Sequence, residues 1–223
     1  MWHEYPDQPS CIHALTHAVV EQVQACLQKS GACTLAVSGG RSPIPLFESL
    51  AQADLPWPRL RLRLVDERYV PPNHPDSNES LVRRHLLTGQ AAAADFRGLY
   101  QAGASIDNAV AAANHDAQPI DIALLGMGDD GHMASLFPDA RQLNAALASD
   151  AAGYLQITPP QAPHERISLR LAAMRGSGHL FLYIAGPHKK KILNEAENKP
   201  NPRLPISLLA AEPGVPLDVY WHP

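Results

Sequence analysis

The sequence predicts a three-layer α/β/α fold, in which helices cover both faces of a mainly parallel, Rossmann-like sheet. Two observations carry this prediction. Short apolar runs, typical of strands buried on both faces, alternate along the chain with segments of helical periodicity. Several of these runs end in glycine-rich or charged turns, as expected for a parallel sheet with its binding loops at one edge. With 223 residues and no repeats, we expect a single domain over residues 1–223.

The first part of the chain shows this alternation clearly. Residues 12–29 carry apolar side chains at helical spacing, and Gly31 is placed to end that helix. A short apolar run at residues 34–37 then predicts a buried strand. In the following turn we expect Ser42 to cap the next helix and Pro43 to occupy its first turn.

The middle of the chain continues the pattern. Residues 60–65 are the next predicted strand, and a polar, proline-rich loop follows it through Asp76. Ser77 is expected to cap a helix with an apolar face formed by Leu81, Val82, Leu86 and Leu87. Ser105 begins an alanine-rich helix that runs to about Asp116.

The remaining elements are predicted in the same way. Strands are expected at residues 122–125, 154–158, 167–171, 180–184 and 217–221. A basic helix is expected from Gly186 to Glu197, and a short helix near residues 205–211. Three prolines between the second and third of these strands indicate a rigid loop.

Composition and charge exclude several classes of protein. Eighteen Lys and Arg against 22 Asp and Glu give a net charge of −4, which leaves no general basic field for nucleic acid or an anionic membrane. The sequence shows no leader pattern and no apolar run long enough to cross a bilayer, so we expect a cytoplasmic protein. Cys11, Cys26 and Cys33 lack metal-ligand spacing and the 11 histidines are scattered, so we expect reduced thiols and no metal site.

The most informative segment is residues 121–138, where an apolar run ends in a glycine-rich loop containing Asp129, Asp130 and His132. In open α/β sheets, ligands bind at the carboxyl ends of such strands. A histidine beside an acid at this position is a candidate general base. Asp130 would orient its ring or stabilise the imidazolium. The alternative is a histidine on an ordinary surface turn.

The same loop matches the dinucleotide-binding pattern G-x-G-x-x-G at residues 126–131. Two features oppose that interpretation. Two carboxylates stand where a pyrophosphate would lie. The acid expected at the end of the next strand is also missing, because Asp150 precedes the strand at 154–158 instead of ending it. The glycines are better explained as a tight turn that lets His132 face a cleft.

A second polar turn, Ser-Gly-Gly-Arg-Ser at residues 38–42, follows a predicted strand. A glycine pair before a helix exposes backbone N–H groups, and the helix end favours negative charge. We therefore expect a phosphate at Gly39 and Gly40, with Arg41 as an added contact. An ordinary strand-to-helix turn is the alternative. The Gly-Lys-Ser/Thr ending of a Walker loop is absent.

Charged residues also follow other predicted strands. Asp66 and Arg68 are candidate substrate contacts, and the planar guanidinium of Arg68 suits phosphate or carboxylate oxygens. A structural Asp–Arg network is the alternative. Lys189 is the best placed of three consecutive lysines for a phosphate contact. Arg166 is either a charge on the rim or a further phosphate ligand, and the sequence does not separate these two interpretations.

Taken in order, the motifs resemble the 6-phosphogluconolactonases of the glucosamine-6-phosphate isomerase/deaminase superfamily. The matching segments cover nearly the whole chain and lie at residues 38–43, 66–71, 76–78, 125–138, 163–169 and 186–189. The resemblance implies hydrolysis of 6-phospho-D-glucono-1,5-lactone to 6-phospho-D-gluconate in the oxidative pentose phosphate pathway, without a metal or an organic cofactor. It implies that His132 is the general base and that Gly39, Gly40, Arg68 and Lys189 hold the substrate and its phosphate. Arg41 and Met133 stand where the family usually has a small residue or a threonine.

Two other functions are compatible with this fold, a sugar-phosphate deaminase and a non-catalytic sensor. Amino-sugar phosphate deaminases typically carry an acidic residue where this chain has Phe137, and a tyrosine where it has Arg68. Both differences favour the lactonase. A non-catalytic sugar-phosphate sensor would need the phosphate contacts but not His132 and Asp130. We therefore predict water attack on a small phosphorylated sugar lactone, and a monomer, because no exposed apolar stripe stands out.

Overall fold

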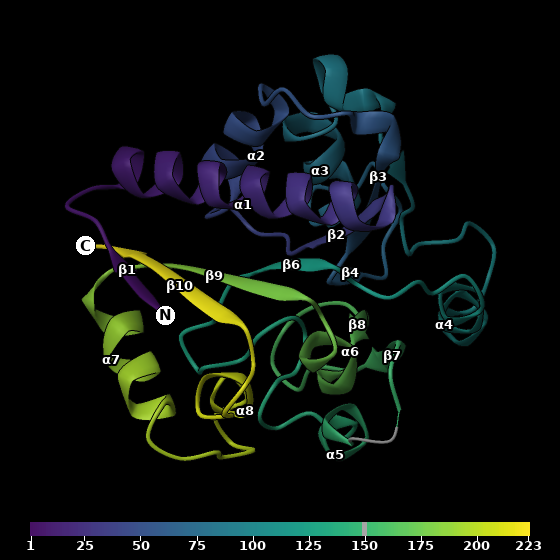
Figure 1. Ribbon diagram of the computed structural model, residues 1–223. Coiled ribbons are helices and arrows are strands. Elements are labelled where there is room, and N and C mark those ends of the chain that lie inside the picture. Colours follow the sequence, from purple (N-terminus) through teal and green to yellow (C-terminus); the bar gives the residue numbers. More distant parts are fainter. Residues whose placement is uncertain (149–150) are drawn as a thin grey trace.

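The computed structural model describes residues 1–148 and 151–223, and its centre is a seven-stranded sheet between two layers of helices (Figure 1). The strand order is β1-β10-β9-β6-β2-β3-β5, and every neighbouring pair is parallel. The predicted three-layer α/β/α fold is confirmed. Asp150 lies outside the described residues. Within the described ranges, no helix combines the length and apolar character needed to span a membrane.

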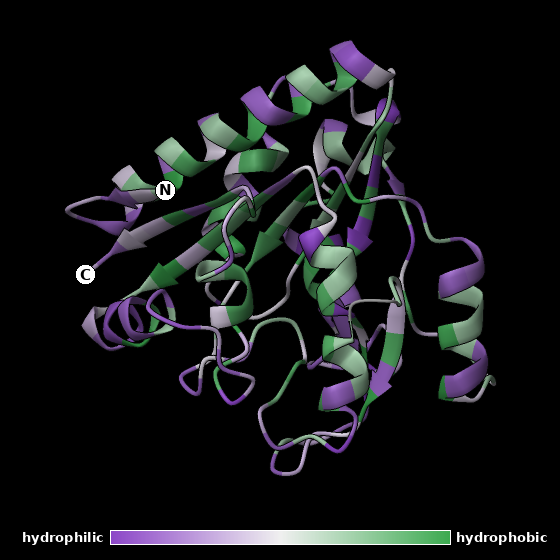
Figure 2. Cartoon of the chain, turned by 60° about the horizontal axis from the view of Figure 1, so that its bottom comes forward, coloured by the Kyte–Doolittle hydropathy of each residue, from purple (hydrophilic) through white to green (hydrophobic). Residues whose placement is uncertain are grey.

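The strands of this sheet are short, and the central ones are buried on both faces. They are β1 (Trp2–Glu4), β2 (Cys33–Val37), β3 (Leu60–Leu64), β5 (Asp95–Phe96), β6 (Ile122–Leu125), β9 (His179–Ala185) and β10 (Leu217–His222). All residues of β2 and β6 are buried, as expected for central strands covered by helices. Figure 2 shows these strands largely in green, while many of the connecting loops are purple.

The helices form a layer on each face of the sheet (Figure 1). One layer contains α1 (Gln8–Ser30), α2 (Ile44–Ala51) and α3 (Asn78–His85), and the other contains α5 (Leu143–Leu147), α6 (Leu171–Arg175), α7 (Pro187–Ala196) and α8 (Ser207–Ala210). Helix α4 (Ile106–His115) packs against β7 at one side of the molecule. The described residues also form two 3₁₀ helices, η1 (Trp57–Arg59) and η2 (Gly89–Ala93).

The caps explain where the first helix begins and ends. Asp7 accepts a hydrogen bond from the backbone N–H of Ser10 at 2.9 Å, so α1 begins earlier than the predicted residue 12. Gly31 ends it in the left-handed conformation, with φ of 79°, as predicted.

The predicted caps at Ser77 and Ser105 are confirmed, because each accepts from a backbone N–H in the first turn of its helix. The predicted cap at Ser42 is wrong. Helix α2 begins only after Pro43, and no side chain among the described residues caps its first turn. The N–H of Ile44 instead donates to the Arg41 carbonyl at 3.3 Å.

A second, three-stranded sheet was not predicted from the sequence. It is antiparallel and consists of β4 (Asp66–Arg68), β8 (Arg166–Leu169) and β7 (Tyr154–Ile157). The loop predicted after residues 60–65 is therefore wrong over its first three residues, which pair with β8. The strand predicted at 167–171 is shifted, since Leu171 already belongs to α6.

The strand order defines the place where a ligand binds. From β2 the chain continues outward through β3 to β5, and it then returns to β6 on the other side of β2. The loops after β2 and β6 therefore lead away in opposite directions and leave a crevice at the carboxyl edge of the sheet. Such a switch point is where open α/β sheets bind their ligands.

Candidate active site

A cavity of about 330 Å³ opens at this switch point. Its volume lies at the lower end of the range for small-molecule sites. Seven of the predicted site residues line it: Gly39, Gly40, Asp66, Arg68, His132, Arg166 and Lys189. The other two do not. Arg41 is exposed on the loop after β2, and Asp130 lies beside the His132 ring.

His132 lines the cavity, and Asp130 orients its ring. Nδ1 lies 2.5 Å from Oδ1 of Asp130, and the same oxygen accepts the backbone N–H of His132 at 3.1 Å. An ionised carboxylate only accepts hydrogen bonds, so Nδ1 of the neutral ring carries the proton and Nε2 keeps a lone pair. Partial burial acts to raise the pKa of Asp130, but the N–H and the ring of His132 outweigh it and leave this pKa below its usual value. The pair can therefore act as a base with its orienting acid.

A tight glycine turn brings His132 and Asp130 together. The backbone N–H of Gly128 donates to the His132 carbonyl at 2.8 Å, and Gly131 adopts a φ of 76°. A Cβ atom at Gly128 would lie only 2.2 Å from Cε1 of His132 and 2.8 Å from Oδ1 of Asp130. The missing side chain is what leaves room for the imidazole.

Phe137 packs against the same imidazole, with the two ring centroids 4.4 Å apart. Phe137 also lines the cavity. Its ring holds the imidazole from one side, while Asp130 holds it by the hydrogen bond. The orientation of His132 is thus fixed by packing and by a polar contact.

The loop after β2 approaches Asn78 so closely that only glycine fits. A Cβ atom at Gly39 would lie 1.9 Å from Oδ1 of Asn78, whose Nδ2 donates to the Asp66 carbonyl at 2.8 Å. Gly40 has a φ of 97°, which glycine adopts without strain. The hydroxyl of Ser38 is buried in this turn and has no hydrogen-bond partner among the described residues. The turn therefore offers this hydroxyl to a ligand.

Asp66 is buried on the cavity wall and is held by two polar neighbours. Its Oδ2 accepts the Ser135 hydroxyl at 2.5 Å, and Nδ2 of Asn78 lies 3.5 Å from its Oδ1. Ser135 belongs to the loop of His132, whereas Asn78 begins α3. Asp66 thus connects both sides of the cavity.

Glu67 is fully buried and organises the same region from behind. Its carboxylate accepts the backbone N–H groups of Arg68, Asn78 and Glu79 at 2.7 to 2.8 Å, and the Ser77 hydroxyl at 3.1 Å. Burial raises the pKa of Glu67 to about 7, and the three N–H groups act against this because they stabilise the ionised form. Glu67 thus fixes the end of β4 and the beginning of α3, which carry the cavity residues Arg68 and Asn78.

Arg166 lies on the cavity wall and is buried, so it is not a charge on the rim, whereas its role as a phosphate ligand stays a prediction. Its side chain is 5% exposed, and its Nε and Nη1 have no hydrogen-bond partner among the described residues. Burial lowers the pKa of Arg166, and the neighbouring Arg68 acts in the same direction. Nη1 of Arg68 donates to the Asp76 carbonyl at 2.6 Å. The two guanidinium groups give the cavity a strong preference for an anion.

Lys189 approaches the cavity from the first turn of α7. Its Nζ donates to the Met127 carbonyl at 2.6 Å and lies 3.9 Å from the Asp129 carboxylate. Both contacts belong to the loop of His132. Lys189 therefore adds positive charge on the side of the cavity where the histidine lies.

A group of titratable side chains stands beside this site. Nε2 of His164 lies 3.0 Å from Asp76, and the His74 and His164 rings meet edge to face at 5.1 Å. One ligand atom from each of the three residues lies within 4.8 Å of the others, so they are able to hold a cation. His164 also has a φ of 70°, which is unusual outside glycine.

Several cavity residues were not predicted as site residues from the sequence. Asn78, Ser135 and Phe137 line the cavity, as does Ser38 with its unpaired hydroxyl. Asn78 belongs to a motif that the sequence analysis names, but its contact with Gly39 joins two different loops. Ser135 and Phe137 belong to the Met-Ala-Ser-Leu-Phe run after His132. The sequence pattern alone does not show which residues of that run line the cavity and which are buried in the core.

Comparisons with known proteins identify the family that this fold and site resemble. The family described as "Glucosamine-6-phosphate isomerases/6-phosphogluconolactonase" matches residues 6–221. A 6-phosphogluconolactonase from Neisseria meningitidis is 40% identical, over 99% of this chain and 98% of its own length. One from Pseudomonas putida is 39% identical, over 99% of this chain and 92% of its own length.

Solved structures agree with the sequence comparisons. The crystal structure of a putative 6-phosphogluconolactonase from Neisseria gonorrhoeae superposes with a TM-score of 0.96 and is 41% identical. The match covers 100% of this chain and 99% of that one.

Proposed function

The chain belongs to the glucosamine-6-phosphate isomerase/6-phosphogluconolactonase family, and we propose that it hydrolyses 6-phospho-D-glucono-1,5-lactone to 6-phospho-D-gluconate. One observation of the site carries this proposal. A histidine oriented by a carboxylate lines the same cavity as two arginines, one of which has unpaired N–H groups. A base and an anion site in one small cavity suit a phosphorylated ester. They favour the lactonase over a sensor that only binds.

His132 acts as the general base in this proposal. A water molecule attacks the lactone carbonyl carbon while Nε2 of His132 takes one of its protons. The tetrahedral intermediate then expels the ring oxygen, which receives that proton from the imidazolium. Asp130 accepts the Nδ1–H throughout and stabilises the imidazolium, as the acid of a triad does. General base catalysis of this kind contributes about 10²–10⁴-fold.

The phosphoryl group is held away from the base by Arg166 and Arg68. Buried guanidinium groups bind phosphate strongly because each offers several N–H donors in one plane. The backbone N–H groups of Gly39 and Gly40 add to this binding, and phosphate binding positions the lactone ring. The ammonium of Lys189, on the side of the cavity where the histidine lies, stabilises the negative charge that develops on the carbonyl oxygen.

The remaining predicted contacts have distinct roles in this proposal. The Asp66 carboxylate and the Asn78 amide are suited to sugar hydroxyls, because together they accept and donate hydrogen bonds. Arg41 stands exposed next to Gly40, where its long side chain reaches a bound phosphate only by folding over the cavity.

Lactone turnover tests the proposal. The lactone is generated with glucose-6-phosphate dehydrogenase, and its loss is followed above the spontaneous rate for wild type and for His132→Ala. We expect acceleration by the wild type and a loss of at least about 10²-fold in the variant. A folded wild type that does not accelerate the loss contradicts the lactonase. Ammonia release from glucosamine 6-phosphate would then support the deaminase.

We further infer that the protein is a monomer. Among the described residues, Met1 is the only large apolar side chain that is exposed. A stable homodimer normally buries a substantial apolar patch. Light scattering after size exclusion should give the mass of one 24.2 kDa chain.

A further inference from the structure

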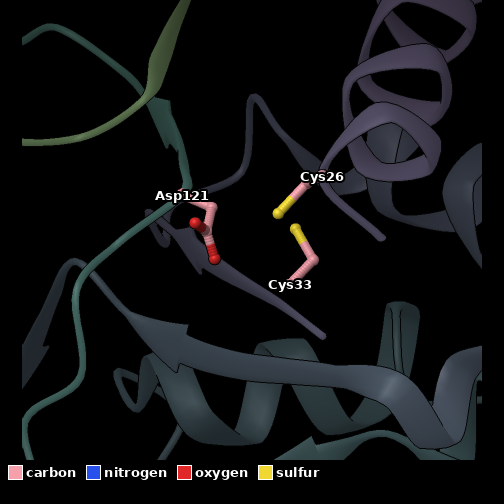
Figure 3. A group of neighbouring side chains, drawn as sticks. All are labelled: Cys26, Cys33 and Asp121. Carbon is pink, nitrogen blue, oxygen red and sulfur yellow. The ribbon is translucent and has the colours of Figure 1, made fainter. Parts of the chain in front are cut away.

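A cluster of three side chains lies at the opposite edge of the sheet from the cavity, and the proposed reaction does not use it. Cys26 belongs to the last turns of α1, Cys33 is the first residue of β2, and Asp121 directly precedes β6. One ligand atom from each lies within 4.8 Å of the others. Figure 3 shows the two sulfur atoms pointing toward each other, with the Asp121 carboxylate to one side of them.

Backbone contacts hold two of the three side chains in place. The Asp121 carboxylate accepts the Thr34 N–H at 2.8 Å through one oxygen, and its own N–H donates to the Thr34 carbonyl at 3.0 Å. The thiol of Cys26 lies 3.5 Å from the Ala32 carbonyl, which it meets across the turn between α1 and β2. The cluster is therefore assembled by the fold before any ligand binds.

The chemistry of the cluster favours a soft cation. Two cysteine sulfur atoms and one carboxylate oxygen lie within 4.8 Å of one another, and Cys33 is fully buried. Sulfur ligands select metal ions of the zinc type over hard cations.

We propose that Cys26, Cys33 and Asp121 bind a thiophilic divalent cation of the Zn²⁺ and Cd²⁺ type, with a water molecule as the fourth ligand. Two thiolates and a carboxylate are ligands that Zn²⁺ accepts in tetrahedral geometry. Sulfur ligands of such an ion are about 3.8 Å apart. The ligand atoms of the cluster lie within 4.8 Å of one another, so small rotations of the side chains are enough to reach this value. Binding exchanges the two thiol protons for the cation, and both protons are released to solvent.

The position of the site predicts a structural role. The ion would join the end of α1 to the first residue of β2 and the segment before β6. The cluster is separated from the Ser38 turn by the length of β2, roughly 16 Å at about 3.3 Å per residue. Stability should therefore respond to the ion, whereas turnover should not. The sequence analysis predicted no metal site, because Cys26 and Cys33 lack metal-ligand spacing and the third ligand, Asp121, is distant along the chain.

Titration with Cd²⁺ tests the proposal. Metal-free protein is kept reduced with a non-thiol reductant, and the ultraviolet thiolate-to-Cd²⁺ charge-transfer band is followed. We expect a saturable band at one equivalent, displaced by Zn²⁺, and a rise in Tm with either ion. Cys26→Ala should weaken binding by more than the roughly 10–100-fold that the loss of an outer-shell partner costs. Cys11→Ala, a buried thiol outside the cluster, is the matched control and should bind as the wild type does.

Two further variants make the test decisive. Asp121→Asn keeps an oxygen acceptor for Thr34 and should weaken Cd²⁺ binding without unfolding the protein. Cys26 is only partly buried, so Cys26→Ala should fold and keep wild-type lactone turnover. A wild type without a saturable band overturns the proposal. A band that survives Cys26→Ala, or one that disappears in Cys11→Ala instead, also overturns it.

Discussion

Arg68 and Arg166 stand directly opposite each other across the antiparallel strands β4 and β8. Like charges at directly opposed positions destabilise a sheet. Arg166 is also buried, with two of its nitrogen atoms lacking a partner among the described residues. A fold that holds two guanidinium groups in this arrangement is less stable without a ligand than with one. We therefore propose that the pair is a preformed site for the substrate phosphate.

Arg166→Met should weaken phosphate recognition without weakening the fold. Methionine keeps much of the apolar volume and removes both the charge and the unpaired N–H groups. A charge-assisted hydrogen bond is worth about 1.5–3 kcal/mol, so we expect the Kd of 6-phosphogluconate to rise by roughly 10–150-fold. The free energy of unfolding of the ligand-free protein should not fall, because repulsion from Arg68 is relieved. Calorimetric titration and urea unfolding measure the two quantities.

Gluconate provides the control for this prediction, because it lacks the phosphoryl group. Its weak binding should be the same in the wild type and in Arg166→Met. A variant that loses affinity for both compounds equally would show that Arg166 shapes the cavity and does not meet the phosphate.

Asp130→Asn should lower kcat/KM. Asp130 has a pKa below its usual value, so it is ionised wherever the enzyme works, and its charge stabilises the imidazolium that forms on His132 during the reaction. Without that charge the imidazolium is less stable, and the orientation of the ring is also weakened. We expect steady-state kinetics to show the loss of a large part of the roughly 10²–10⁴-fold that a general base contributes. Asp129→Asn, on the same loop, should lose much less, and equal losses in both variants would contradict the assignment.

The sequence predicted the main sheet because its central strands carry their own signal. The apolar runs of β2 and β6 are buried on both faces, and no polar alternation obscures them. The small sheet was missed for the opposite reason. Strand β4 is the polar sequence Asp-Glu-Arg, and its partner β8 lies about one hundred positions further along the chain. Nothing local distinguishes such a strand from a loop.

The sequence predicted those contacts of the candidate site that lie within one short motif. It did not predict the contacts that depend on the pairing of strands β4 and β8. His132 and Asp130 are two positions apart, so a short motif contained their contact. The burial of Arg166 follows from its pairing with β4, which explains why the sequence left its position open. The contacts of Glu67 cross a loop of about ten residues, and the cluster around Cys26 includes the distant Asp121, so neither arrangement is visible in a short motif.

Gly128→Ala should displace His132 while leaving the fold intact. The new methyl group would overlap the imidazole at Cε1 and also crowd Asp130, so the ring must rotate away from both. We expect a fall in kcat of about 10²-fold or more, the contribution of a positioned base. The imidazole NMR signals should shift. Gly126→Ala, where an added Cβ has no atom within 4 Å, should keep those signals. An unshifted His132 in Gly128→Ala would refute the steric argument.

Glu67→Gln should destabilise the protein although it changes a single atom. The carboxylate accepts three backbone N–H groups and one hydroxyl, shared between its two oxygens. An amide has only one oxygen, so its NH₂ group must face at least one backbone N–H, whichever way it is turned. A buried donor without an acceptor costs about 1–3 kcal/mol. We expect a loss of about 2–3 kcal/mol in urea unfolding at pH 8, where Glu67 is ionised because its pKa is about 7.

The exposed Glu195 supplies the control for this last prediction, since Glu195→Gln should change the free energy of unfolding by less than about 0.5 kcal/mol. Activity should also fall in Glu67→Gln, because the carboxylate holds the backbone of Arg68 and Asn78 beside the cavity. This loss should appear chiefly as a weaker affinity for the phosphorylated product. Wild-type stability in Glu67→Gln would show that the four donors find other acceptors, and that Glu67 does not organise the segment between β4 and α3.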